Sequence, residues 1–181
     1  MSLIFLSFLY ALSLSTTAAM PTDFINASCH ATLYSTLCYK SLKPYAWKIQ
    51  KSPRLIAMMA LSISVKTARE TESYLAKLAK SDRLSSRESG AVKDCLKEMG
   101  NTVSQLNDSV TELKKLDKGD FSWHMSNLKT WVSAALTDES TCTDGFSDGA
   151  QNGEIKSKIQ AKMGIVVQLT SNALALCNKL G

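Results

Sequence analysis

Apolar side chains recur every three or four residues along most of this chain, which is the period of an amphipathic α-helix. The longest such seam covers about six turns and consists of Val92, Leu96, Met99, Val103, Leu106, Val110 and Leu113. Similar seams run over residues 61–78, 121–135 and 155–180, and no period-two alternation is long enough for a strand. Four helices with one seam each can bury those seams only against one another. The sequence therefore predicts an all-α four-helix bundle over residues 53–181.

Short polar links between the seams indicate that successive helices are antiparallel neighbours, in an up-down-up-down order. Ser52 and Pro53 suit the start of the first long helix. Ser85 or Ser86 can cap the second, with Glu88 placed to complete a capping box. Residues 118–120 separate the second helix from the third, and residues 149–153 end the third. Residues 22–50 precede the bundle and are predicted to form a hairpin of two short helices.

The first 19 residues have the pattern of a secretory signal peptide. They carry no charge, and an apolar stretch from Leu3 to Leu14 is followed by small residues up to Ala19. Cleavage there leaves a secreted domain of residues 20–181. The apolar stretch is shorter than the about 20 residues that span a bilayer, and no second one follows, so no membrane association is expected.

Cysteine positions give an independent test of the bundle. Five cysteines follow residue 19, which in an oxidising compartment predicts two disulfides and one free thiol. If the chain folds back at Gly119, Cys95 and Cys142 lie 24 and 23 residues from the turn, at the same height on adjacent helices. Cys29 and Cys38 are close enough for a short bridge in the hairpin. Cys177 lies next to the last seam and is expected to be a buried free thiol.

Charge and motifs exclude several classes of function. The net charge of +5 is modest and the lysines are scattered through the helical stretches, without the dense basic stripe of a nucleic-acid binder. The two histidines belong to different elements, and no catalytic, phosphate-binding or metal-ligand motif is present. We expect no enzyme activity, metal or cofactor. Asn26 and Asn107 begin glycosylation sequons, in keeping with secretion. The class of function that remains is a protein that acts by binding another protein.

One segment makes the chain resemble a known family. Residues 129–137 read KTWVSAALT, and Cys142–Phe146 read CTDGF. Together with Cys29, Cys38, the Cys95 and Cys142 pair and the late Cys177, they resemble the plant invertase and pectin methylesterase inhibitor family over essentially the whole mature chain.

The resemblance implies a function and a surface. It implies an extracellular cell-wall (apoplastic) protein, monomeric when free, that blocks the pectin-binding cleft of pectin methylesterase in a one-to-one complex. In such inhibitors the enzyme-facing surface includes the second and third bundle helices near their cysteines. The corresponding positions here are Lys97, Asn101, Ser104, Asp108, Thr137, Asp138, Thr141 and Asp144.

Two alternatives stay open at this point. Family members that inhibit acid invertase share a Pro-Lys-Phe element before the third long helix, where this chain has KGDFSW at residues 118–123. That difference, and the segment at residues 129–137, favour the methylesterase branch over the invertase branch. The second alternative is an extracellular helical binding module that inhibits no enzyme.

Overall fold

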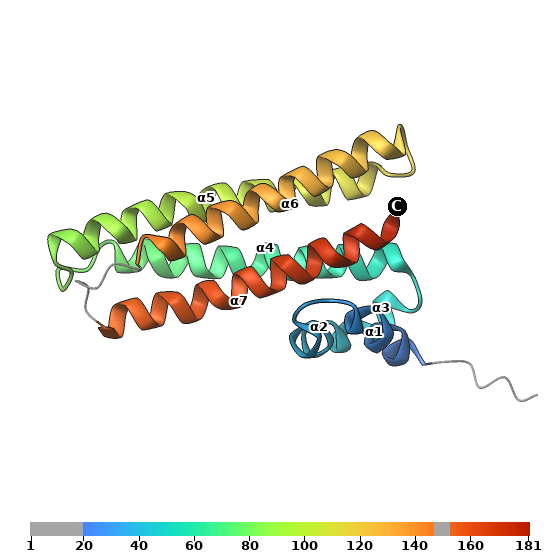
Figure 1. Ribbon diagram of the computed structural model, residues 1–181, viewed down its shortest axis with the longest axis horizontal. Coiled ribbons are helices and arrows are strands. Elements are labelled where there is room, and N and C mark those ends of the chain that lie inside the picture. The colour runs from blue at the N-terminus through green and yellow to red at the C-terminus, as the bar shows by residue number, and fades with distance from the viewer. Residues whose placement is uncertain (1–19, 147–152) are drawn as a thin grey trace, which may run out of the picture.

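The computed structural model describes residues 20–146 and 153–181, and these form an elongated helical bundle with a small helical subdomain at one end (Figure 1). The four long helices are α4 (Pro53–Leu78), α5 (Ser86–Lys115), α6 (Phe121–Asp144) and α7 (Gly153–Cys177). Each packs against the next, and α7 closes the ring against α4. Successive long helices run in opposite directions (Figure 1). The predicted antiparallel four-helix bundle is confirmed.

Side-chain caps begin the helices at the positions that the sequence indicates. The Ser52 hydroxyl accepts from a backbone N–H in the first turn of α4, and the Asp120 carboxylate does the same for α6. At α5 the Ser85 hydroxyl accepts from the Glu88 N–H, while the Glu88 carboxylate accepts from the Ser85 N–H at 2.8 Å. This reciprocal capping box was predicted with either Ser85 or Ser86, and Ser85 provides it.

Arg54, in the first turn of α4, closes the other end of α5. Its guanidinium donates to the backbone carbonyls of Leu113 and Lys114, at 3.0 and 3.2 Å, and pairs with the Asp117 carboxylate. The last carbonyls of an α-helix lack partners within the helix, so a cation there satisfies them and complements the helix dipole.

The buried seam of α5 differs in detail from the predicted one. Leu96, Val103 and Val110 are only partly buried, whereas the polar residues Thr102 and Ser109 are fully buried. They share a seam with Val92, Cys95, Met99, Leu106 and Leu113. The helix is turned this way because it packs against both α4 and α6. The Ser109 hydroxyl donates to the Gln105 carbonyl, four residues earlier, at 2.9 Å. The Thr102 hydroxyl is buried without a hydrogen-bond partner among the described residues.

The N-terminal subdomain contains more elements than the hairpin of two short helices that we predicted. Helices α1 (Pro21–His30) and α2 (Ser35–Leu42) form the hairpin. A 3₁₀ turn, η1 (Lys43–Tyr45), and a further short helix, α3 (Ala46–Ile49), continue to α4. A second 3₁₀ turn, η2 (Asn178–Leu180), follows α7. The prediction missed η1 and α3 because a single turn is too short to show a period.

The subdomain packs against α4 and α7, and its apolar residues join the bundle core. Ile25, Leu42 and Ile49 are almost completely buried there. Figure 1 shows the subdomain under the start of α4 and the end of α7, away from α5 and α6. The proposed signal peptide and most of the 149–153 link lie outside the described residues. No helix within residues 20–146 or 153–181 has the length and apolar character needed to cross a membrane.

Candidate partner-binding surface

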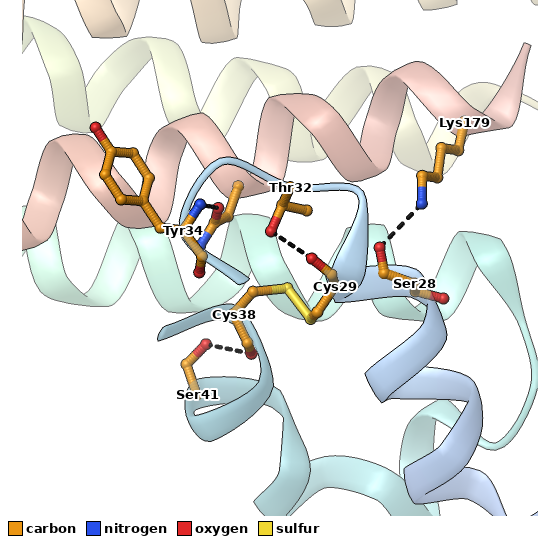
Figure 2. Close-up of a disulfide and its surroundings, with 8 residues drawn as sticks. Ser28, Cys29, Thr32, Tyr34, Cys38, Ser41 and Lys179 are labelled. Carbon is orange, nitrogen blue, oxygen red and sulfur yellow. Dashed lines mark hydrogen bonds between the residues drawn. A yellow bond between two sulfur atoms is a disulfide. The ribbon is translucent and has the colours of Figure 1, made fainter. Parts of the chain in front are cut away.

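Two disulfides link neighbouring helices, as the sequence spacing indicated. Cys95 of α5 is bonded to Cys142 of α6, with their Cα atoms 4.4 Å apart. Cys29 and Cys38 join α1 to α2, with Cα atoms 5.6 Å apart, and Figure 2 shows this bridge on the underside of the bundle. The fifth cysteine, Cys177, is free and buried. The first bridge fixes the height of α6 against α5, so side chains on the outer faces of these helices hold constant relative positions.

Hydrogen bonds from α7 and η2 also hold the hairpin in place. The Asn172 side chain of α7 is buried and accepts from the Tyr34 N–H at 3.2 Å while it donates to the Tyr34 carbonyl at 3.0 Å. Beyond α7, the Lys179 ammonium donates to the Ser28 carbonyl at 2.9 Å. The α1–α2 hairpin is thus attached to the bundle through its backbone as well as its apolar side chains.

On α5, the four predicted contact residues form one exposed stripe. Lys97, Asn101, Ser104 and Asp108 are separated by four, three and four residues, so they lie on one face of the helix, and all are exposed. The stripe is about 17 Å long at the rise of an α-helix. Asn101 donates to the Glu98 carboxylate at 3.3 Å, which orients its amide.

On α6, the structure separates the predicted contact residues into two groups. Thr137, Thr141 and Asp144 are exposed at spacings of four and three residues and form a second stripe. The Thr141 hydroxyl donates to the Thr137 carbonyl at 2.9 Å, which leaves its methyl group to face solvent or a partner. Asp138 is instead half-buried towards α5, and one of its carboxylate oxygens is buried without a hydrogen-bond partner among the residues that the structure describes.

Asp138 lies among polar side chains of α5. Burial raises the pKa of its carboxyl, and the negative charge of Glu98 raises that pKa further. The Glu98 and Gln105 side chains are its neighbours from α5. Asp138 was placed among the contact residues from the family resemblance alone. It lies about 100° around the helix from Thr137, and this rotation turns it towards α5.

A hollow of about 380 Å³ lies between α5 and α6, beside the Cys95–Cys142 bridge. Three small residues leave the space open, and charged side chains stand around it. Its lining is Arg87, Gly90, Ala91, Asp94, Cys95, Glu98, Thr141, Cys142 and Gly145. Sequence analysis missed Arg87 and Asp94 as candidates. The available signal was their place in the sequence before Cys95, by eight residues for Arg87 and by one for Asp94.

The buried titratable groups of the bundle do not form a reactive site. Glu139 of α6 is fully buried and accepts from the Thr170 hydroxyl of α7 at 2.8 Å, and burial raises its pKa to about 8. Burial also raises the pKa of the Cys177 thiol to about 12, so it stays protonated. No three His, Cys, Asp or Glu side chains in the described parts of the chain are grouped so that they could hold a metal ion.

A charged cluster closes the opposite end of the α5–α6 pair. The Glu112 carboxylate is 2.6 Å from the His124 ring nitrogen and 3.0 Å from the Lys115 ammonium. Hydrogen bonds from His124 and then Lys115 lower the pKa of Glu112. Since this cluster joins α5 to α6 next to their turn, we interpret it as part of the support for the two helices.

The two sequons lie in different environments. Asn26 is exposed on α1, so its amide is accessible for a glycan. Asn107 is half-buried on α5, where its amide donates to the Val103 carbonyl at 2.6 Å and accepts from Arg69 of α4 at 3.3 Å. Glycosylation remains a prediction at both positions.

Comparison with known proteins shows where the chain belongs. Its fold and site define a disulfide-bonded helical binding protein with an exposed polar surface on two linked helices. Residues 23–176 match the plant invertase/pectin methylesterase inhibitor family, and the chain belongs to this family.

Individual relatives agree with that assignment. The chain is 45% identical over 163 residues to pectinesterase inhibitor 9 of Arabidopsis thaliana, covering 87% of this chain and 80% of that protein. It is 40% identical over 180 residues to a 21 kDa protein of Daucus carota, covering 98% and 93%. The crystal structure of a mutant pectin methylesterase inhibitor from Arabidopsis has a TM-score of 0.68 and 20% identity, covering 88% of this chain and 97% of that one. That structure supports the shared fold.

Proposed function

We propose that this chain is a secreted, non-catalytic protein inhibitor of pectin methylesterase. In this proposal the exposed faces of α5 and α6 bind across the pectin-binding cleft of the enzyme in a one-to-one complex. The free inhibitor is a monomer in the apoplast, delivered there by a signal peptide over residues 1–19. The observation that carries the proposal is the pair of exposed stripes on two helices held in register by the Cys95–Cys142 bridge.

Rigidity of the surface supports inhibition by obstruction. A protein that must fill another protein's cleft loses less entropy on binding when its contact residues are fixed beforehand. Here the disulfide, the Glu112–His124 contact and the buried seam fix the two helices. The stripes are polar and carry Lys97, Asp108 and Asp144, which suits a reversible complex between two soluble proteins.

The methylesterase is favoured over acid invertase as the target. The relative pectinesterase inhibitor 9 is named as an inhibitor of the esterase. The turn before α6 lacks the Pro-Lys-Phe element of invertase inhibitors. The direct test is to mix the oxidised mature chain with plant pectin methylesterase and, separately, with acid invertase. Inhibition of the esterase, with a raised apparent KM and unchanged kcat, is the expected result. Inhibition of invertase alone would overturn the choice of target, and inhibition of neither would favour a non-inhibitory binding module.

The contact surface is tested by a double substitution, Thr141→Arg with Asp144→Arg. Two bulky cations on the exposed stripe of α6 should weaken esterase inhibition at least about tenfold, since a central contact residue is often worth more than that. The matched control is Ser62→Arg with Glu70→Arg, which makes the same change of charge at exposed positions of α4. Circular dichroism should show equal helicity in both variants. Unaltered inhibition by the first variant would remove this face from the proposal.

The stoichiometry of the inhibitor–esterase complex can be measured directly. Size-exclusion chromatography with light scattering should give the mass of the free chain as a monomer, and the mass of one inhibitor plus one esterase for the complex. A complex containing two inhibitor chains would contradict the one-to-one arrangement.

A further inference from the structure

A basic and aromatic surface on the N-terminal subdomain is not used by the proposed inhibition. Residues 39–51 read YKSLKPYAWKIQK, with four lysines, three aromatic residues and no acidic residue. They span the end of α2, the η1 turn, α3 and the following turn. We name as the basic–aromatic face the residues Lys40, Lys43, Trp47, Lys48 and Lys51.

This segment is amphipathic across its short helices. Leu42 and Ile49 point into the core and are almost completely buried. All five residues of the basic–aromatic face are exposed, and the Trp47 side chain is 69% exposed. The Trp47 indole is therefore accessible to a binding partner, next to the ammonium group of Lys48.

The lysines of this face are not neutralised by the protein. None of the four forms an ion pair with a carboxylate in residues 20–146 or 153–181. The Lys48 ammonium lies 5.0 Å from the centre of the Trp47 ring, and the Lys43 ammonium lies 5.6 Å from that of Tyr39. Residues 20–51 contain these four lysines against one carboxylate, Asp23, a net charge of +3 out of +5 for the whole chain.

The chemistry of the face fits a linear sugar polymer that carries carboxylates. Ammonium groups without a carboxylate partner in the protein can pair with carboxylates of a polymer, and an exposed indole can pack against the apolar face of a sugar ring. Trp47 is the one exposed large apolar side chain in residues 39–51, which is too little apolar surface to anchor a bilayer. The product of pectin methylesterase has the required chemistry, because ester hydrolysis converts a neutral methyl ester into a carboxylate.

We propose that the basic–aromatic face binds polygalacturonate, the de-esterified form of pectin. This inference rests on the proposed function for the identity of the polymer. The face lies on a subdomain that packs against α4 and α7, whereas the candidate inhibitory surface lies on α5 and α6 (Figure 1). Both surfaces can therefore be occupied at once, and the polymer holds the inhibitor where the enzyme has already acted.

The test is direct binding of the oxidised chain, residues 20–181, to immobilised polygalacturonate. Highly methylesterified pectin and neutral dextran serve as comparison surfaces. We expect binding to polygalacturonate that falls steeply between about 0.05 M and about 0.2 M salt, and at least about tenfold weaker binding to the other two. Lys40→Gln with Lys43→Gln and Lys51→Gln should weaken polygalacturonate binding at least about tenfold. Trp47→Ala should weaken binding without altering the salt slope.

The matched control is Lys77→Gln with Lys80→Gln and Lys118→Gln, which removes the same charge from exposed lysines of the bundle. This control should bind the polymer as the unmodified chain does. Equal weakening by both triple variants would show that net charge alone is at work and would overturn the proposal. So would equal binding to methylesterified pectin, or tighter binding to vesicles of anionic phospholipid.

Inhibition of the esterase on a soluble oligomeric substrate separates the two proposals. The Lys40, Lys43 and Lys51 variant should inhibit as well as the unmodified chain, because its changes lie off the α5–α6 surface. A chain that inhibits but does not bind polygalacturonate would refute this inference alone. A chain that binds polygalacturonate but does not inhibit would refute the proposed function, and would leave the basic–aromatic face as a binding site in its own right.

Discussion

Replacing Glu139 by glutamine is expected to make the bundle more stable at neutral and mildly alkaline pH. The carboxyl group is fully buried between α6 and α7, where one oxygen accepts from Thr170 and the other has no hydrogen-bond partner among the described residues. Burial, and to a smaller extent the charge of Asp138, raise its pKa to about 8. The folded protein therefore keeps this proton well above the pH at which the unfolded chain loses it.

The sign and size of the effect follow from that difference. Between about pH 4.5 and about 8 the folded state binds a proton that the unfolded state has released, so the free energy of unfolding falls as pH rises. The slope attributable to this group is about 1.4 kcal/mol per pH unit, and the whole window amounts to about 5 kcal/mol. This is comparable with the total stability of many domains. Glutamine has nearly the same shape as the protonated acid and does not titrate, so the variant lacks this slope.

The measurement is urea unfolding of both proteins, with disulfides intact, at several values between pH 5 and pH 7.5. The difference between them cancels every other group that titrates in this range. Glu70→Gln, at an exposed position of α4, is the control and should follow the unmodified chain. Equal pH slopes for the unmodified chain and Glu139→Gln would refute the reasoning.

Two further changes test what holds the molecule together. Replacing Cys95 and Cys142 by alanine should lower the free energy of unfolding by about 4 kcal/mol, because the bridge closes a loop of 47 residues; urea unfolding measures this, and a smaller loss than from removing the shorter hairpin bridge would contradict it. Asn172→Leu should cost about 2–5 kcal/mol, since it leaves the N–H and carbonyl of Tyr34 without partners. Limited proteolysis should then cut the hairpin faster than the bundle, and an unchanged cleavage rate would argue against the attachment described here.

Much of the bundle was predictable because its information is local and periodic. Three- and four-residue spacing identifies the four long helices, and caps such as Ser52 and Asp120 mark where two of them begin. The height of Cys95 against Cys142 then follows from counting residues on both sides of a turn. The buried hydroxyls of Thr102 and Ser109 could not be predicted this way. Their burial depends on how α5 is rotated between two neighbours, which is a tertiary property.

The candidate surface was only partly predictable for the same reason. Lys97, Asn101 and Ser104 were expected on the surface and are exposed there, but their role in binding stays a prediction. The half-buried position of Asp138 depends on Gln105 and Glu98 of the neighbouring helix. Likewise, the hollow between α5 and α6 exists because small residues of two separate segments meet, which no single stretch of sequence displays.

The burial of Cys177, the cysteine that forms no disulfide, has a consequence for how the protein is handled and how it is made. In the folded chain the Cys177 thiol is buried and its pKa is raised to about 12, so we expect it to resist oxidants, alkylating agents and disulfide formation with a second chain. Covalent dimers formed through Cys177 would therefore come from molecules that had unfolded, or that had never folded. The fraction of covalent dimer on a non-reducing gel therefore reports how many molecules exposed Cys177 before or instead of folding.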